Sequence, residues 1–354
     1  MVVSSSKTPA HLQAEMADII SQLPAMAHGK LIQQILETVV RMIGREADRL
    51  DWKILNYALL DLEQGFQKFY PHRHVRKVTI FGSARTPATQ PDYQLASDFA
   101  KRAVQKGFMV MTGAGGGIMQ AGNEGAGPDC SFGLNIQLPF EQGANPVMDG
   151  DEKLINFKYF FTRKLFFLRE SDALALFPGG FGTQDEAFES LTLVQTGKAS
   201  PMPIVLLDHP GGDYWKGWDG YIHDYLLERH LISADDPSLY TITTDLEEAW
   251  AAIASFYRVY HSIRYVGERL VIRLNCPLMA GALEQLNTDF ADLLSQGKIE
   301  TTAALPEEKG DETAALPRLV LHFNHRDFGR LHQLIATINQ LGIPVPEREH
   351  PEHK

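Results

Sequence analysis

Between residues 75 and 208 the chain alternates short apolar runs with amphipathic stretches, and three of the apolar runs end in glycine-rich turns. Apolar residues recur at helical spacing in the stretches between the runs, as in YQLASDFAKRAVQKG (93–107). Strands that alternate with helices through short links form β-α-β units and a parallel sheet. We therefore expect an α/β fold with a doubly wound, Rossmann-like parallel sheet over residues 72–260. The expected strands lie in VRKVTIFGSART (75–86), FMVMTG (108–113), SFGLNIQLP (131–139), DALALFPGG (172–180) and PMPIVLLD (201–208).

The two flanks of this region have a different character. Apolar residues at spacings of three and four predict helices in HLQAEMADIISQL (11–23), KLIQQILETVVRMI (30–43) and WKILNYALLDLEQGFQKFY (52–70). We expect a helical N-terminal extension over residues 1–71. The final hundred residues read as β-α-β-β-α, with a helix from about Leu278 to Gln296 and a loose, charged linker at 306–313. This order predicts a small ferredoxin-like α+β module over residues 261–354.

Charge and composition exclude several classes of partner. The 354 residues carry a formal net charge of −11, which argues against nucleic acid because phosphate-backbone binding depends on Lys and Arg. No run approaches 18 apolar residues and no apolar segment follows Met1, so we expect a cytoplasmic protein without a membrane partner. Two cysteines, Cys130 and Cys276, provide neither a disulfide framework nor a Cys-based zinc site. The histidines at 72–74, 350 and 353 lack partners at ligand spacing, and we expect no metal.

Three glycine turns follow strands of the expected sheet: FGSART, TGAGGGIM and PGGFGTQDE. The carboxyl ends of parallel strands share one edge of the sheet, where backbone N–H groups and helix dipoles favour an anion. A single turn of this kind also serves as a tight connection without any ligand. The turns match neither the Walker pattern nor G-x-G-x-x-G, so they favour a mononucleotide or sugar phosphate over ATP or NAD. The candidate phosphate-binding residues are Gly179, Gly180, Gly182 and Thr183, with Gly82, Ser83, Gly115, Gly116 and Gly117 as further candidates for substrate binding.

Charged residues near the third turn have two interpretations each. Thr183 and Glu186 have the spacing of a capping box, in which each side chain satisfies an unpaired backbone donor. Asp185 and Glu186 are adjacent and point about 100° apart on a helix, so at most one of them faces a ligand. Arg163 and Lys164 lie in the expected helix NFKYFFTRKLFFLRES (156–171) and either extend to solvent or clamp a phosphorylated substrate.

PGGFGTQDE (178–186), preceded by TRK (162–164), resembles the hallmark P-G-G-x-G-T-x-x-E of the LOG family. These proteins are cytokinin riboside 5′-monophosphate phosphoribohydrolases and have often been mislabelled lysine decarboxylases. The resemblance covers residues 75–258 and is nearest to the longer bacterial members. It implies that Arg163 and Glu186 are catalytic and that the glycine turn holds the 5′-phosphate of a nucleoside monophosphate. It also implies hydrolysis of the N-glycosidic bond without any cofactor.

Other roles stay open alongside this one. The same fold also carries non-catalytic nucleotide or cofactor carriers, as in molybdenum-cofactor carrier proteins, whereas a pyridoxal-phosphate decarboxylase is disfavoured because Lys164 beside Arg163 is no Schiff-base arrangement. The second turn departs from the family, since Ala114, Gly116 and Gln120 replace Gly, Pro and Glu. Surplus apolar surface on the helix at 160–171 predicts a homodimer or a higher even oligomer; cover by the N-terminal helices is the alternative.

Overall fold

A computed structural model describes residues 20–137, 143–308 and 310–343, and the chain divides into two compact units after Leu62. In the first unit, α2 (Gly29–Ile43) confirms the helix expected at 30–43. The next helix, α3 (Arg49–Phe69), confirms the one expected from residue 52 and continues into the second unit. The helix expected at 11–23 lies almost wholly outside the described residues. Within the described part of the chain, no helix is long and apolar enough to cross a bilayer.

The second unit is built on a seven-stranded parallel sheet with the order β4-β3-β2-β1-β5-β6-β7. The strands are β1 (Lys77–Phe81), β2 (Met109–Thr112), β3 (Ser131–Ile136), β4 (Leu154–Phe157), β5 (Ala173–Leu176), β6 (Ile204–Leu207) and β7 (Tyr240–Thr243). The chain fills the sheet outward from β1 to β4 and then from β5 to β7 on the other side. The direction therefore reverses between β1 and β5, which makes this pair the topological switch point where ligands bind in such sheets.

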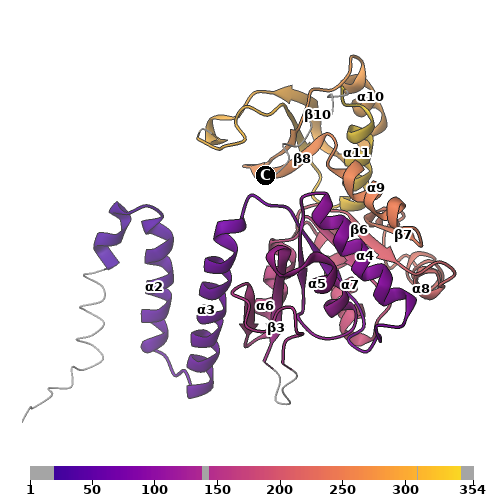
Figure 1. Cartoon of the computed structure of the whole chain (residues 1–354). Helices are drawn as coiled ribbons and strands as arrows, with labels where there is room; N and C mark the ends of the chain where they lie inside the picture. The colour runs from indigo at the N-terminus through magenta and orange to yellow at the C-terminus, as the bar shows by residue number, and fades with distance from the viewer. Residues whose placement is uncertain (1–19, 138–142, 309, 344–354) are drawn as a thin grey trace, which may run out of the picture. The chain divides into compact units, whose positions relative to one another are not determined.

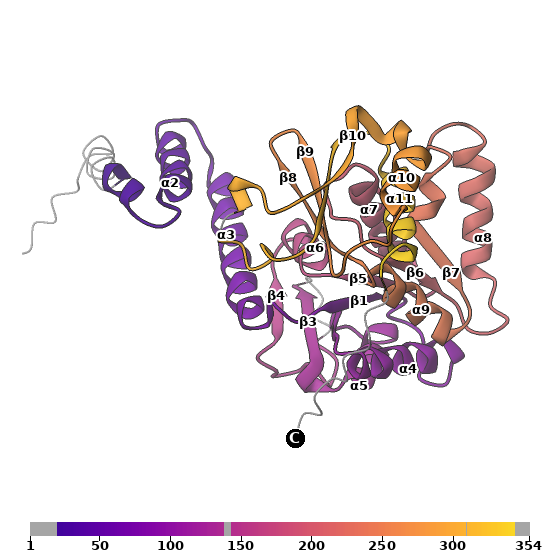
Figure 2. The same ribbon diagram turned by 90° about the horizontal axis from the view of Figure 1, so that it is seen from above.

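Helices cover both faces of the sheet, which confirms the doubly wound fold (Figure 2). One face carries α4 (Pro91–Gln105), α5 (Ile118–Ala126) and α9 (Leu246–Phe256), and the other carries α6 (Phe160–Arg169), α7 (Phe181–Gln195) and α8 (Tyr214–Tyr221). Every residue of β1, β2, β5 and β6 is buried. Strands covered on both faces need no polar alternation, which explains why the sequence shows continuous apolar runs there.

Two strands of this sheet were not predicted from the sequence. The segment from Asn156 was read as helix, but residues 154–157 pair with β3 as β4, and α6 begins only at Phe160. The segment at 240–243 was not identified as a strand, yet it pairs with β6 as β7. Both are four-residue edge strands, and a run that short carries little periodicity. Their place depends on the neighbouring strand more than on their own residues.

The C-terminal part forms a four-stranded antiparallel sheet with the order β10-β11-β9-β8 (Figure 1). Its elements are β8 (Tyr260–Val266), β9 (Arg269–Leu274), α10 (Ala282–Asp289), β10 (Leu294–Thr302), β11 (Arg318–Phe323) and α11 (Phe328–Gln340). From β9 to α11 these elements follow the expected β-α-β-β-α order. The outer position beside β9 is filled by β8, which comes earlier in the chain and was not expected.

The helix expected from Leu278 to Gln296 is wrong in its length. It covers only α10, and β10 already begins at Leu294. The Asn287 side chain explains this limit, because its amide bonds both the backbone N–H and the backbone oxygen of Ile299. These two bonds hold the following strand against the helix, which is a tertiary contact that helical periodicity does not report.

The expected loose linker at 306–313 is also wrong, because buried ion pairs hold it. Glu308 is almost fully buried and accepts hydrogen bonds from Arg273 (2.8 Å) and Arg318 (3.1 Å). Asp311 accepts a further bond from Arg273 at 2.7 Å. Burial would raise the pKa of Glu308, but the hydrogen bonds and the two guanidinium groups hold it below its usual value. Glu308 and Asp311 are thus internal ion-pair partners of the module.

The module is fixed to the α/β domain through α11. The Ser238 hydroxyl donates to the Gly329 backbone oxygen at 3.0 Å, and the Gln333 amide donates to the Asp235 carboxylate at 2.9 Å. The Phe328 ring packs on Gly197, where a Cβ would overlap it. The two sheets of the second unit therefore share a packed and hydrogen-bonded boundary.

Candidate functional site

The three glycine turns meet at the carboxyl edge of the parallel sheet, between β1 and β5. The Ser83 backbone N–H donates to the Pro178 oxygen at 3.1 Å, and the Ser83 oxygen accepts from the Ile118 N–H at 3.0 Å. One residue of the first turn therefore connects the second and third turns. Strand order makes this possible, because β1 lies between β2 and β5.

Two glycines are required by the close approach of these turns. Gly117 has a φ of +61°, and a Cβ at this position would overlap the Ser83 carbonyl oxygen. A Cβ at Gly179 would overlap the Thr183 hydroxyl. Any larger residue at either position would separate the turns, since left-handed backbone and missing volume are both properties of glycine.

The start of α7 corrects the capping-box interpretation. The helix begins at Phe181, with Gly180 as its N-cap and without a side-chain cap. Thr183 is therefore the third residue of the helix and Glu186 the sixth, so they do not form a box. The first backbone N–H groups of a helix have no intrahelical acceptor. Because no side chain satisfies them here, this N-terminus can accept an anion.

A cavity of about 730 Å³ opens beside this helix start. Its lining consists of Phe81, Gly82, Ser83, Ala84, Arg85, Met119, Phe160, Arg163, Gly180, Phe181, Gly182, Thr183, Asp185 and Glu186. Seven of these were expected at the site from the sequence: Gly82, Ser83, Arg163, Gly180, Gly182, Thr183 and Glu186. The expected residues Gly115, Gly116, Gly117, Gly179 and Lys164 are not among the lining residues. Of these, Gly117 and Gly179 lie behind the cavity wall, where the missing side chain lets the turns approach one another.

Arg85 and Phe181 also line this cavity, although neither was predicted from the sequence to be a site residue. Arg85 follows the first turn and its backbone N–H bonds the Ser83 hydroxyl at 3.1 Å. Phe181 is 97% exposed at the cavity mouth. The sequence did carry a signal for Arg85, which is a basic residue two positions after the Gly-Ser that follows a strand. For Phe181 the sequence carried no signal, since its exposure depends on where α7 begins.

Arg163 reaches the cavity from α6 and lies against the second glycine turn. A Cβ at Gly113 would lie 2.9 Å from its Nη2, and the Phe167 ring centre is 5.2 Å from its guanidinium carbon. Its Nε is buried and has no hydrogen-bond partner among the described residues. Burial lowers the pKa of Arg163 while Glu186 opposes that shift, and a guanidinium stays charged in either case. A buried, charged donor without a partner is suited to bind a ligand.

Glu186 faces the same cavity from α7. Its side chain is 12% exposed, and burial raises its pKa to about 7, although Lys164 and Arg163 lower it. The ordinary value for a glutamate is near 4.3. At neutral pH the carboxyl group therefore exists in both protonation states, which suits a general base. A perturbed group of this kind in a cleft is a candidate catalyst.

Lys164 does not enter the cavity, contrary to its expected role in substrate binding. Its amine lies 2.7 Å from the Asp185 carboxylate, 2.5 Å from Glu189 and 3.8 Å from Glu186. Burial opposes the charged amine, but hydrogen bonds to Asp185 and Glu189 outweigh it and raise the pKa of Lys164. The Asp185 side chain is exposed and forms an ion pair with Lys164. Of the two adjacent acids, Asp185 and Glu186, only Glu186 is therefore buried.

The second turn keeps its shape despite its departures from the family. Ala114 has a φ of +58°, a conformation that glycine adopts without strain, and its backbone oxygen accepts from the Asn145 N–H at 2.7 Å. The buried Asn145 amide also donates to the Gly115 oxygen at 3.0 Å. Gln120 points elsewhere, since its amide bonds Glu124 at 2.7 Å. The lost carboxylate at this position is thus not part of the cavity lining.

One group of potential metal ligands occurs away from this cavity. Asp92, Asp208 and His209 each place a ligand atom within 4.8 Å of the others. The His209 ring nitrogen is 2.9 Å from Asp92, and the Trp215 N–H is 3.4 Å from Asp208. Hydrogen bonds within the protein account for this arrangement, so we assign no metal to it.

Comparison with known proteins gives one family match and several structural similarities. A search of curated protein sequences finds no match. Among solved structures, the molybdenum cofactor binding protein of Rippkaea orientalis is 20% identical, with 51% of this chain and 97% of that chain covered at a TM-score of 0.36. The molybdenum cofactor carrier protein of Chlamydomonas reinhardtii is 20% identical, with 51% and 96% covered at 0.36. DNA processing protein A of Helicobacter pylori is 17% identical, with 49% and 77% covered at 0.34.

The family match carries more weight than these distant similarities. The model described as "Possible lysine decarboxylase" matches residues 103–253, which include Arg163, the PGGFGTQDE turn and Glu186. The matched segment runs from α4 to α9 and contains most of the parallel sheet. Residues 103–253, which contain the motif, are therefore similar to a LOG-type domain.

Proposed function

We propose that the cavity at the carboxyl edge binds a nucleoside 5′-monophosphate and hydrolyses its N-glycosidic bond. The observation that carries this proposal is the pair of Arg163 and Glu186. They face one cavity of about 730 Å³. The buried Nε of Arg163 has no hydrogen-bond partner among the described residues, and the carboxyl group of Glu186 has a pKa of about 7. A site that only binds a phosphate needs the glycine turns and has no need of such a carboxyl group.

Each part of the cavity then has a role in the reaction. The N-terminus of α7 and the Arg85 side chain bind the 5′-phosphate, and remote binding energy positions the ribose. As the bond between C1′ and the base nitrogen breaks, positive charge develops on the ribose and ionised Glu186 stabilises it. Glu186 accepts a proton from water as the water oxygen bonds to C1′. The base leaves with the bonding electrons, and Arg163 stabilises its negative charge. The proton that Glu186 took from water then passes to the base, which neutralises the base and restores ionised Glu186.

A pyridoxal-phosphate site, which the description of the family model suggests, does not fit these residues. Such enzymes need a lysine amine free to form a Schiff base. Lys164 lies between Asp185 and Glu189, whose hydrogen bonds keep its amine protonated, and it does not line the cavity. The paired amine of Lys164 thus does not support the decarboxylase activity that the description of the family names.

The experiment incubates the purified protein with AMP, GMP, CMP and UMP and measures free base by chromatography. We expect release of base from at least one of them, and loss of most turnover in Glu186→Gln with retained nucleotide binding by calorimetry. Glu228→Gln is the matched control, because it makes the same change at an exposed glutamate that does not line the cavity.

Two outcomes contradict the proposal in different ways. Base release at a near-normal rate by folded Glu186→Gln would remove Glu186 from the mechanism. Binding of a monophosphate without any base release by the wild type would instead favour the alternative, a non-catalytic nucleotide or cofactor carrier.

A further inference from the structure

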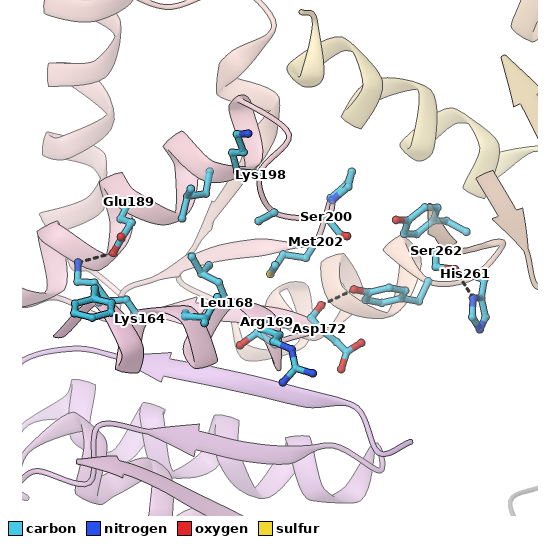
Figure 3. A pocket seen from close by; sticks show the side chains of 18 residues that line it. Lys164, Leu168, Arg169, Asp172, Glu189, Lys198, Ser200, Met202, His261 and Ser262 are labelled. Atoms are coloured by element: carbon cyan, nitrogen blue, oxygen red, sulfur yellow. Dashed lines mark hydrogen bonds and ion pairs between the residues drawn. The ribbon is translucent and has the colours of Figure 1, made fainter. Parts of the chain in front are cut away.

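A second cavity, of about 650 Å³, lies at the opposite end of β5 from the first (Figure 3). Asp172, which directly precedes β5, is part of its lining, whereas the first cavity is lined by the turn that follows β5. The α/β domain contributes α6 and the loop at 198–202, and the C-terminal module contributes Tyr260, His261 and Ser262 at the start of β8. No residue lines both cavities.

This second cavity combines an apolar wall with a polar rim. Leu168, Leu193 and Met202 form part of the apolar surface, and Ser200 and Ser262 offer hydroxyl groups. Its volume is within the range of about 300–1,000 Å³ that is usual for small-molecule sites. Such a surface fits an apolar body with a few directed polar contacts.

The charges of the lining favour an anion. Three cations, Lys164, Arg169 and Lys198, outnumber the two carboxylates, Asp172 and Glu189, although the chain as a whole carries a formal net charge of −11. A locally positive cavity on an acidic protein concentrates small anions and does not attract a polyanion to the whole surface.

Only one of these three cations has no ion pair with another described residue. Lys164 is bound to Asp185 and Glu189, and Arg169 bonds Glu170 at 2.7 Å. Lys198 has no ion-pair partner within the part of the chain that the structure describes. Figure 3 shows its side chain on the loop that follows α7, apart from the Lys164–Glu189 pair. The cavity therefore has a single available countercharge.

We propose that this cavity is a second ligand site, for a small organic anion with an apolar body, and that Lys198 binds the anionic group. Carboxylates and phosphate esters share the required chemistry. The apolar body lies against Leu168, Leu193 and Met202, and the seryl hydroxyls donate to the ligand. Because the walls come from two sheets, a bound ligand also holds the C-terminal module against the α/β domain.

Lys164 connects the second ligand site to the first cavity. Its amine lines the second cavity, yet it lies 3.8 Å from the Glu186 carboxylate. An anion held by Lys198 adds a negative charge to the cavity that Lys164 also lines, and this charge weakens the positive field that favours ionised Glu186. A ligand in the second cavity thus lowers the fraction of Glu186 that is ionised and can act as a base. This coupling rests on the proposed function, whereas the ligand site itself does not.

The binding test uses 1-anilinonaphthalene-8-sulfonate (ANS), a fluorescent apolar anion, with the full-length protein. We expect Lys198→Glu to weaken ANS binding at least about tenfold, equivalent to about 1.4 kcal/mol. Lys216→Glu is the matched control, because it makes the same charge change on α8 at an exposed residue that lines neither cavity. Lys198 is exposed too, so both variants are expected to fold, which circular dichroism verifies. Equal ANS affinity in the wild type and Lys198→Glu overturns the proposal.

Displacement identifies the anionic group of the ligand. Phenylacetate and phenyl phosphate carry the same ring with a carboxylate or a phosphate ester, and each is titrated against bound ANS. Displacement by either one supports the site and names its class. Displacement by neither overturns the proposal.

The kinetic arm measures release of base from AMP with and without ANS. We expect ANS to lower kcat without raising KM in the wild type, and to have little effect in Lys198→Glu. Competition with AMP alone would contradict the coupling, because it would place ANS in the first cavity. If the protein releases no base at all, the proposed function fails while the binding arm still decides the second ligand site.

Discussion

Two adjacent basic residues on α6 perform different tasks because they point in different directions. Arg163 enters the cavity with an Nε that no described residue bonds, and Lys164 turns to the carboxylates of α7. Neighbouring positions on a helix differ by about 100°, so one of them faces the ligand and the other the supporting acids. Lys164 therefore acts on the site through Glu186 and does not contact the space for substrate.

This arrangement predicts the pH dependence of the proposed hydrolysis. Glu186 must be ionised to act, so we expect kcat/KM for AMP to rise with pH through its pKa of about 7. Lys164 lowers this pKa, and Lys164→Met should therefore move the rise to higher pH. The measurement is kcat/KM from about pH 5 to 9, with Lys216→Met as the control. A rise that stays in place in Lys164→Met, or moves to lower pH, would show that the lysine has no such influence.

At the scale of elements, the site depends on turns that approach one another closely. The second turn supplies a matched pair of positions: Gly117 is left-handed and close to the Ser83 oxygen, whereas a Cβ at Gly116 would lie 3.4 Å from the Ala84 oxygen, an ordinary contact. Two glycines of one turn thus differ in whether the fold requires them.

We expect Gly117→Ala to destabilise the protein and Gly116→Ala to leave it nearly unchanged. The left-handed backbone alone costs about 1–2 kcal/mol for a residue with a Cβ, and the overlap with Ser83 adds to this. Gly116→Ala should change the free energy of unfolding by less than about 0.5 kcal/mol. Urea unfolding measures both variants. Equal stabilities of the two would show that the turns can separate without loss.

The start of α7 predicts a preference for phosphorylated substrate. The uncapped N-terminus and Arg85 are available for a 5′-phosphate, so kcat/KM should be at least about a hundredfold higher for AMP than for adenosine. Arg85→Ala should reduce the rate with AMP and leave that with adenosine almost unaffected. Comparable rates with AMP and adenosine in the wild type would mean that the glycine turn serves only as a turn.

At the scale of the whole molecule, apolar surface remains exposed around the candidate site. Phe160 of α6 and Phe181 line the first cavity and are 54% and 97% exposed, and Phe161 and Leu165, also of α6, line the second cavity and are 58% and 47% exposed. Exposed apolar groups that lie together on a surface mark an interaction site. The helix that carries Arg163 is therefore also the part of the second unit best suited to bind a partner.

We expect this surface to form a twofold homodimer, in which each cavity lies near the partner subunit. A closed C2 interface buries the same patch on both chains. Light scattering at micromolar concentration measures the assembly. A mass of twice 39.6 kDa, or a higher even multiple, supports the dimer, and a mass near 39.6 kDa contradicts it.

Local sequence patterns were sufficient for the core strands and the glycine turns. The pair Arg163 and Glu186 came from the resemblance of a short motif, and its catalytic role stays a prediction. Strand periodicity and glycine chemistry act over a few residues, and a motif of nine residues is short enough to be read directly. The same patterns missed β4 and β7, because a four-residue edge strand is defined by the strand beside it.

Tertiary structure decided the features that depend on distant neighbours. The capping box looked plausible in sequence, but the N-cap is Gly180, three residues before Thr183, and α7 begins at Phe181. The charges at 306–313 looked like a solvated linker, but Arg273 and Arg318 lie on neighbouring strands and bury Glu308 between them. Sequence alone thus determined which residues could do chemistry. Folding decided their ionisation and their partners, because burial and charge pairing are set by contacts between segments far apart in the chain.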